Sequence, residues 1–111
     1  MDKLTQYRQI VQQLLREYAE IGSPDPDVET QIVFDTERDH YQLMNVGWKN
    51  QRRVYGCFLH IDIKDGKVWL QHNGTEYEVA EQLANLGIPK QDIVIGFHSA
   101  FKRQFTDYAV S

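Results

Sequence analysis

The sequence predicts an α+β fold with an N-terminal helix, an antiparallel four-stranded β-meander, a second helix, a short fifth strand and an aromatic C-terminal tail. Three patterns support this prediction: an amphipathic helical repeat at the start, alternating strands and turns in the middle, and a helix-start signal near residue 75. The 111 residues suffice for one domain with a modest core. We therefore expect a single domain spanning residues 1–111.

Composition and charge exclude several classes of protein. Hydrophobic residues at 41% and charged residues at 25% are ordinary values for a globular domain. The formal net charge of −4 argues against strong direct binding to DNA, because neutralising phosphates requires an excess of Lys and Arg. The single cysteine, Cys57, cannot form an internal disulfide, and we expect it to be a small buried side chain on a strand. Without an apolar signal segment or a membrane-length apolar run, a cytoplasmic protein with no membrane contact is expected.

The first segment, residues 2–21, is predicted to be helical. Gly22 can end this helix, and Pro24 and Pro26 prevent its continuation. Apolar residues recur at the three- and four-residue spacings of one helix face. These residues are Leu4, Tyr7, Val11, Leu14, Leu15 and Tyr18.

A meander of strands follows the helix. The β-rich runs and the polar turns between them have these bounds: strand 29–35, turn 36–39, strand 41–48, turn 49–51 and strand 54–64. Asp65 and Gly66 then form a type I′ hairpin signal, because both turn positions need positive φ.

A two-residue loop at Asp65 and Gly66 sets the register of the last hairpin. It pairs the residues of an apolar face as follows: Ile63 with Val68, Ile61 with Leu70, and Leu59 with His72. The other face has two predicted pairs: Asp62 with Trp69, and His60 with Gln71. Because one face is apolar, we expect both helices to cover it.

The C-terminal third is predicted to contain a second helix and a fifth strand. Thr75 and Glu78 have the spacing of a capping box with Thr75 as N-cap, and Gly87 marks the helix end. The apolar run 93–95 is short, which favours a strand over a helix. We expect the aromatic tail, residues 97–111, to lie back on the sheet or on a second subunit.

Several polar residues are candidates for a chemical site. His60 and Asp62 share one strand face, which could serve a metal ion or an acid–base pair. His72 lies on the opposite face in the predicted register, and His40 lies on a different strand. None of the 4 histidines has a recognised metal-binding spacing, so we interpret them as hydrogen-bonded side chains. No metal, cofactor or catalytic residue is therefore predicted.

Other enzyme motifs have similarly weak support. Asp62 and Lys64 have the acid-x-Lys form of a nuclease strand, but Lys64 borders a turn, as solvated charges do. No phosphate-binding glycine motif or nucleophile motif occurs. The basic pairs 52–53 and 102–103 lie near aromatic residues and could contact phosphate or an acidic partner; we interpret them as surface charges. The sequence therefore predicts no enzyme.

Sequence blocks along nearly the whole chain carry a family resemblance. The most specific are HIDIKDGKVWLQ at 60–71 and IPKQDIVIGFH at 88–98, and DHYQLMNVGW at 39–48 and LTQYRQIVQQLLREYA at 4–19 accompany them. In this order they resemble the XisI family, the fdxN element excision controlling factor. Many relatives carry prolines after the FH block, where this chain has Ser99 and Ala100.

The resemblance implies an accessory regulatory factor, found largely in cyanobacteria, that controls developmentally regulated excision of a DNA element. It also implies that a separate recombinase exchanges the strands and that XisH, a companion resembling endonuclease-fold proteins, acts alongside. We therefore expect a non-enzymatic protein that binds an XisH-like companion. The alternative is a nucleic-acid-binding or metal-dependent hydrolytic protein that uses His60, Asp62 and Arg53 on the open face of the sheet.

The face opposite the helices is the predicted partner-binding surface. Its occupant would be the XisH-like companion or, in a homo-oligomer, a second copy of the chain. Trp69 is central to this prediction, because exposed aromatic patches usually mark association surfaces. In the alternative arrangement, the tail covers Trp69 within one subunit. The candidate residues are Phe58, His60, Asp62 and Trp69, with Phe101, Phe105 and Tyr108 from the tail.

Overall fold

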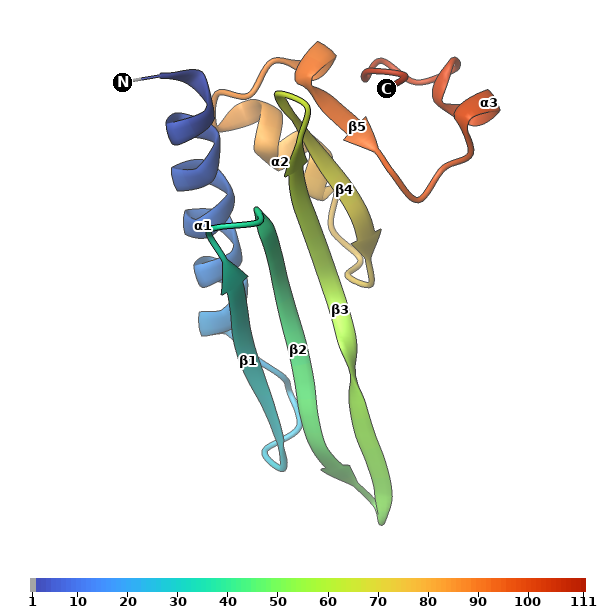
Figure 1. Cartoon of the computed structure of the whole chain (residues 1–111). Helices are drawn as coiled ribbons and strands as arrows, with labels where there is room; N and C mark the ends of the chain where they lie inside the picture. The colour runs from blue at the N-terminus through green and yellow to red at the C-terminus, as the bar shows by residue number, and fades with distance from the viewer. Residues whose placement is uncertain (1) are drawn as a thin grey trace.

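A computed structural model describes residues 2–111 and contains a five-stranded sheet with helices packed on one face (Figure 1). The strand order is β1-β2-β3-β4-β5. The first four strands pair antiparallel as predicted, whereas β5 pairs parallel with β4 after the connection that contains α2. In chain order, the elements are α1 (Lys3–Ile21), β1 (Val28–Asp35), β2 (His40–Lys49), β3 (Arg52–Lys64), β4 (Lys67–Asn73), α2 (Val79–Asn85), the 3-10 helix η1 (Lys90–Asp92), β5 (Ile93–Ile95) and α3 (Ala100–Arg103). The predicted α+β class is confirmed.

Helix α1 ends at Ile21, as predicted, and begins at Lys3, one residue after the predicted start, with Asp2 as its N-cap. The Asp2 carboxylate accepts a hydrogen bond from the Thr5 backbone N–H at 2.8 Å, which satisfies a free donor of the first turn. Gly22 follows the helix with a φ of 67°, a value that residues with a Cβ rarely adopt, and its N–H donates to the Tyr18 carbonyl at 3.2 Å. None of the helices formed by residues 2–111 is both long and apolar enough to cross a membrane.

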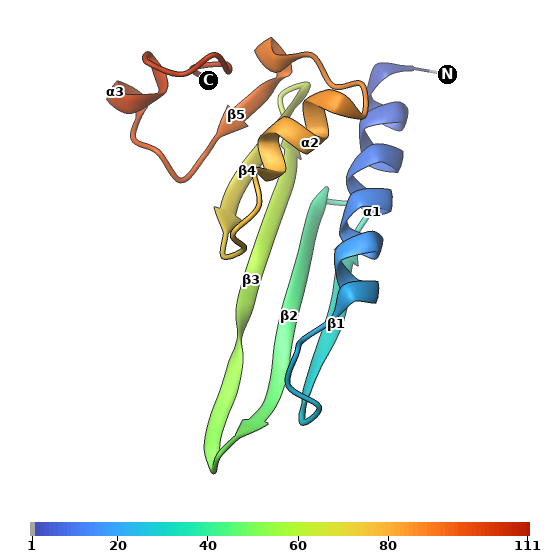
Figure 2. The same cartoon turned by 180° about the vertical axis from the view of Figure 1, so that it is seen from behind.

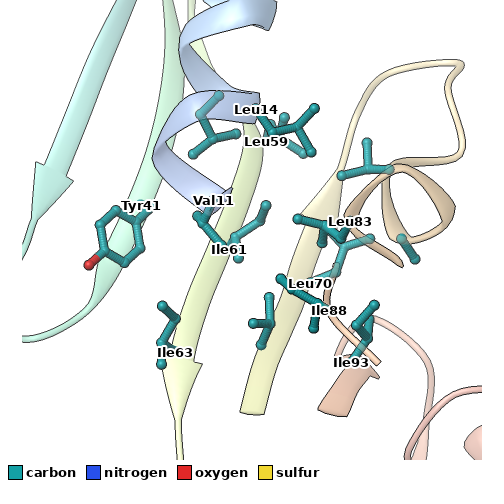
Figure 3. Close-up of a cluster of buried hydrophobic side chains, with 14 of the residues drawn as sticks. Val11, Leu14, Tyr41, Leu59, Ile61, Ile63, Leu70, Leu83, Ile88 and Ile93 are labelled. Atoms are coloured by element: carbon teal, nitrogen blue, oxygen red, sulfur yellow. The ribbon is translucent and has the colours of Figure 1, made fainter. Parts of the chain in front are cut away.

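The hydrophobic core lies between the sheet and the helices α1 and α2, which cover the same face (Figure 2). Figure 3 shows Val11 and Leu14 of α1 and Leu83 of α2 in the same cluster as the strand residues. The five strand residues predicted to face the helices are each exposed by 7% or less, so this prediction is confirmed. They are Leu59, Ile61, Ile63, Val68 and Leu70.

Both hairpin loops next to β3 contain two residues. Asp65 and Gly66 have φ values of 54° and 78°, as the predicted type I′ turn requires. Asn50 and Gln51 also have positive φ values, 50° and 67°, so the preceding loop is equally tight. For this reason β3 begins at Arg52 rather than at residue 54, the predicted start.

Two β-bulges interrupt the regular pairing of β3. Phe58 is the extra residue of β3, because Leu43 pairs with Leu59 while the next residue, Met44, pairs with Cys57. On the other side of β3, Gln71 is the extra residue of β4. The predicted pairs of Leu59 with His72 and of His60 with Gln71 are therefore wrong. The observed pairs are Leu59 with Asn73 and His60 with His72, while Asp62 with Trp69, Ile61 with Leu70 and Ile63 with Val68 are confirmed.

Helix α2 begins later than the capping-box pattern predicts. Its first residue is Val79, and the N-cap Glu78 makes no side-chain capping hydrogen bond. The Thr75 hydroxyl instead donates to Asn73 Oδ1 at 2.6 Å and accepts from the Tyr77 N–H at 3.2 Å. Asn73 thus holds the Thr75 side chain in a turn that precedes the helix, and the predicted N-cap at Thr75 is wrong.

An ion pair fastens α1 to the turn before β2. Arg8 donates from Nε and Nη2 to the two carboxylate oxygens of Asp39 at 2.8 and 3.0 Å, and the Tyr41 hydroxyl donates to Asp39 Oδ1 at 2.8 Å. The hydrogen bond from Arg8 is the main cause that holds the pKa of Asp39 below its ordinary value of 3.8.

Replacing Arg8 by methionine should remove a pH-dependent part of the stability. Because the folded-state pKa of Asp39 is lowered, ionised Asp39 stabilises the fold fully above its unfolded pKa, and the contribution disappears as pH falls through the folded pKa. The difference in unfolding free energy between wild type and Arg8→Met should therefore be largest above about pH 5 and shrink below about pH 4. Urea unfolding at several pH values measures it. Arg16→Met is the control, and a difference that stays constant into strong acid would contradict the assignment.

Candidate functional site

The open face of the sheet, opposite α1 and α2, carries two neighbouring rows of paired residues. Residues that are directly paired in a sheet point their side chains to the same face, so each row forms a continuous strip. The first row runs across all five strands through Asp35, His40, Asp62, Trp69 and Val94. The second runs through Val33, Gln42, His60 and His72.

Two imidazoles converge on one carboxylate at the centre of these rows. His40 Nδ1 lies 2.8 Å and His60 Nε2 lies 2.7 Å from the same oxygen, Asp62 Oδ1. Gln71 Nε2 donates to the other oxygen, Asp62 Oδ2, at 3.2 Å. We call His40, His60 and Asp62 the His–Asp cluster. The sequence predicted the proximity of His60 and Asp62, whereas the contribution of His40 was missed.

The charge state of Asp62 follows from opposing effects. Burial disfavours the carboxylate anion, but hydrogen bonds from His40, His60 and Gln71 together keep the pKa of Asp62 below its ordinary value of 3.8. The carboxylate is thus ionised at neutral pH and accepts hydrogen bonds, which makes it a weak general base.

The geometry around the His–Asp cluster differs from that of a nucleophilic triad. Within residues 2–111, neither imidazole is hydrogen-bonded to a hydroxyl or a thiol. Cys57 lies on β3, where its thiol donates a hydrogen bond to the Leu59 carbonyl and burial raises the pKa of the thiol. Cys57 is half-buried.

Trp69 lies beside the His–Asp cluster and is half-buried between two cations. Lys64 Nζ is 4.8 Å and Arg103 Cζ is 5.2 Å from the centre of its ring. Arg103 reaches this position by hydrogen bonds to backbone carbonyls of β5 and the tail. In this structure the tail therefore partly covers Trp69 within one chain. This is the arrangement that the sequence analysis gave as the alternative to covering by a partner chain.

The remaining candidate aromatics occupy different surroundings. Phe58, in the β3 bulge, and Tyr108, in the tail, both pack against the buried core rather than lining the open face with Trp69. Phe101 and Phe105 are exposed and pack on each other, with ring centres 5.3 Å apart. The tail is attached to the free edge of β5, where the Ala109 N–H donates to the Ile93 carbonyl at 2.9 Å.

A second exposed aromatic surface lies on the arm, which we define as residues 44–57 at the far end of the β2–β3 hairpin. Figure 1 shows the arm extending beyond both helices. The Arg53 guanidinium lies 5.4 Å from the Trp48 ring centre and 5.9 Å from that of Tyr55, and both aromatics are exposed. The arm has three cations and no acidic residue in an otherwise acidic chain. The sequence contained a signal for this surface, because the tight loop at Asn50 and Gln51 places Trp48 opposite Arg53.

The fold and these surfaces define a small α+β protein in which helices cover one face of a five-stranded sheet and a polar His–Asp cluster lies on the other. A family model described as XisI protein matches residues 1–110. The chain belongs to the XisI family, which confirms the resemblance of its sequence blocks.

Two solved structures are similar over nearly their full lengths. One is the crystal structure of a XisI-like protein from Anabaena variabilis ATCC 29413, with 51% sequence identity, a TM-score of 0.92, and coverage of 97% of this chain and 99% of that one. The other is the fdxN element excision controlling factor XisI from the same organism, with 33% identity, a TM-score of 0.87, and coverage of 99% and 100%. A comparison with curated proteins finds no match.

Proposed function

We propose that this chain is an accessory factor in the excision of a DNA element and acts by binding a protein partner rather than by catalysis. The observation that carries the proposal is membership of the XisI family, with similarity over 99% of the chain to a protein named as an excision controlling factor. A controlling factor that leaves strand exchange to another enzyme needs a recognition surface. Exposed aromatic side chains are the residues that most often supply binding energy in such surfaces.

The tail is the proposed partner-binding surface. Phe101 and Phe105 form an exposed pair, and Arg103 between them in sequence is held on Trp69 by the backbone of β5 and the tail. This attachment limits the freedom of the pair before binding, so less conformational entropy is lost on association. The partner that we assign to this surface is an XisH-like companion, with a second copy of the chain as the competing occupant.

Replacing both Phe101 and Phe105 by alanine should weaken binding to an XisH-like companion by at least about tenfold, because interface aromatics commonly contribute more than about 1 kcal/mol each. Titration calorimetry of the purified proteins measures the change. The matched control replaces Trp48 and Tyr55, which are also exposed aromatics, on the arm. If the control variant loses binding and the tail variant retains it, the surface belongs to the arm instead.

Direct contact with nucleic acid is a second candidate function, and the arm is the observation that favours it. Arginine and aromatic side chains that alternate on one surface can contact phosphates and stack on unpaired bases. If the arm acts in this way, Arg53→Ala should weaken the binding of single-stranded DNA, and the wild-type affinity should fall steeply with added salt. Fluorescence anisotropy at two salt concentrations distinguishes this function from partner binding alone.

The proposal also predicts that the purified chain does not cleave DNA. Incubation with Mg²⁺ or Mn²⁺ should leave duplex and single-stranded DNA as intact as in a mock purification, as judged by gel electrophoresis. Asp62→Asn serves as the control, because it removes the one carboxylate of the His–Asp cluster. Cleavage that disappears in Asp62→Asn would replace the regulatory function by a hydrolytic one.

A further inference from the structure

We propose that the His–Asp cluster is a binding site for a divalent transition-metal ion of the zinc class. Each of the three residues offers one ligand atom, and these atoms lie within 4.8 Å of one another. Imidazole nitrogens and carboxylate oxygens are regular zinc ligands, and two histidines with one carboxylate form a known ligand set for divalent transition metals. This metal site lies on the open face and does not depend on the partner binding proposed for the tail.

The distances within the cluster are close to those between ligand atoms around one metal ion. Ligand atoms around a tetrahedral zinc ion, at bond lengths of about 2.0 to 2.1 Å, lie about 3.3 Å apart. In the structure, the two imidazole nitrogens lie 2.8 and 2.7 Å from Asp62 Oδ1, at hydrogen-bond distance. To admit the ion, each imidazole nitrogen would move about half an ångström away from Asp62 Oδ1, and the two nitrogens, which lie within 4.8 Å of each other, would come to about 3.3 Å apart. The two hydrogen bonds would then be replaced by metal bonds.

Proton balance is also satisfied. A neutral imidazole carries one N–H, and the tautomer that donates this N–H to Asp62 must move the proton to its other ring nitrogen when a metal takes its place. In His40 that proton goes to Nε2, and in His60 it goes to Nδ1. Gln42 lies 3.5 Å from His60 Nδ1, and its amide oxygen can accept the new N–H after a rotation of the amide group.

The surroundings orient the ligands as a metal site requires. Gln71 holds the second carboxylate oxygen of Asp62 at 3.2 Å, and the paired strands β2 and β3 fix the backbone positions of all three ligands. The side chains of Asp62 and His60 are 13% and 26% exposed, whereas that of His40 is 51% exposed. The cluster is therefore accessible from solvent on the His40 side, where water or a partner's side chain can complete the coordination.

The ligand chemistry selects the ion. Two nitrogen ligands suit Zn²⁺, Ni²⁺ or Co²⁺, whereas Mg²⁺ and Ca²⁺ prefer sites built from oxygen. Mg²⁺ is consequently a negative probe for the same site.

The test uses the full chain without a histidine tag, titrated with Zn²⁺ by calorimetry and with Co²⁺ by visible absorption. The wild type should bind one Zn²⁺ per chain. Outer-sphere partners alone change metal affinity by about 10- to 100-fold, so His40→Gln, His60→Gln and Asp62→Asn should each weaken binding by at least about tenfold. The control is His98→Gln, because His98 packs on Phe97 outside the cluster and should leave the affinity unchanged.

Circular dichroism of each variant without metal shows whether it folds. His40→Gln should disturb the fold least, because His40 is the most exposed of the three residues. The proposal is overturned if the wild type shows no stoichiometric Zn²⁺ binding, if the folded His40→Gln and His98→Gln variants bind equally well, or if Mg²⁺ binds as tightly as Zn²⁺.

Discussion

Leu59→Ala should lower the free energy of unfolding by about 3 kcal/mol, within the range for large-to-small substitutions in well-packed cores. Leu59 has 0% exposure and lies on the central strand β3, in the cluster shared with α1 and α2 (Figure 3). Removing its isobutyl group loses the transfer free energy of the buried atoms and leaves a cavity, because the paired strands on both sides prevent the backbone from closing over it.

Urea unfolding measures this change in stability through the midpoint at an unchanged m-value. The control is Leu86→Ala, because Leu86 is 40% exposed next to α2 and should change the stability by no more than about 0.5 kcal/mol. Similar small effects in both variants would mean that β3 does not present Leu59 to the helices.

Gly47→Ala should destabilise the protein by about 3 kcal/mol, at the upper end of overpacking effects. A Cβ built on Gly47 would lie 2.1 Å from the Asp27 carbonyl oxygen and 2.7 Å from Val28 Cα. Both are backbone atoms, so no side-chain rotation relieves the contact. The same segment is held by a hydrogen bond from the Trp48 N–H to the Asp27 carbonyl at 3.2 Å. The start of β1 must therefore separate from β2 to admit the methyl group.

Gly56→Ala is the matched control for this prediction. Gly56 lies on the opposite strand of the same arm, and a Cβ there meets no atom within 4 Å. Its replacement should be neutral or stabilise the strand by up to about 1 kcal/mol, because alanine loses less backbone entropy on folding. Equal thermal stability of the two variants would contradict the close contact between Gly47 and the segment before β1.

The apolar patterns of the chain were sufficient to predict the fold. The alternation in β3 and β4 and the Asp65–Gly66 turn identified the pairs Ile63–Val68 and Ile61–Leu70, and the helical spacing identified the buried face of α1. These signals are local, and one apolar face leaves little freedom of register. The start of α2 was mispredicted because Asn73, at the end of the preceding strand, binds the Thr75 hydroxyl.

The complete His–Asp cluster could not be predicted from the apolar pattern, because it depends on a register shift that this pattern does not encode. If the pairing of Lys49 with Arg52 continued regularly, His40 would lie opposite Ile61 and point toward the helices. The extra residue Phe58 shifts the register by one, so that His40 faces Asp62 on the open face. A β-bulge adds only one residue to the alternating pattern of a strand. A phenylalanine at that position does not distinguish a bulged strand from a regular one.

The most direct test of the account is to mix this 13.0 kDa chain with an XisH-like companion, separate the mixture by gel filtration, and measure the mass of each species by light scattering. Partner binding predicts a single species whose mass is that of both proteins together, and this species should be lost when Phe101 and Phe105 are both replaced by alanine. Two separate peaks with the masses of the individual proteins, at concentrations of about 100 μM, would mean that the dissociation constant lies above about 100 μM. That result would contradict the account.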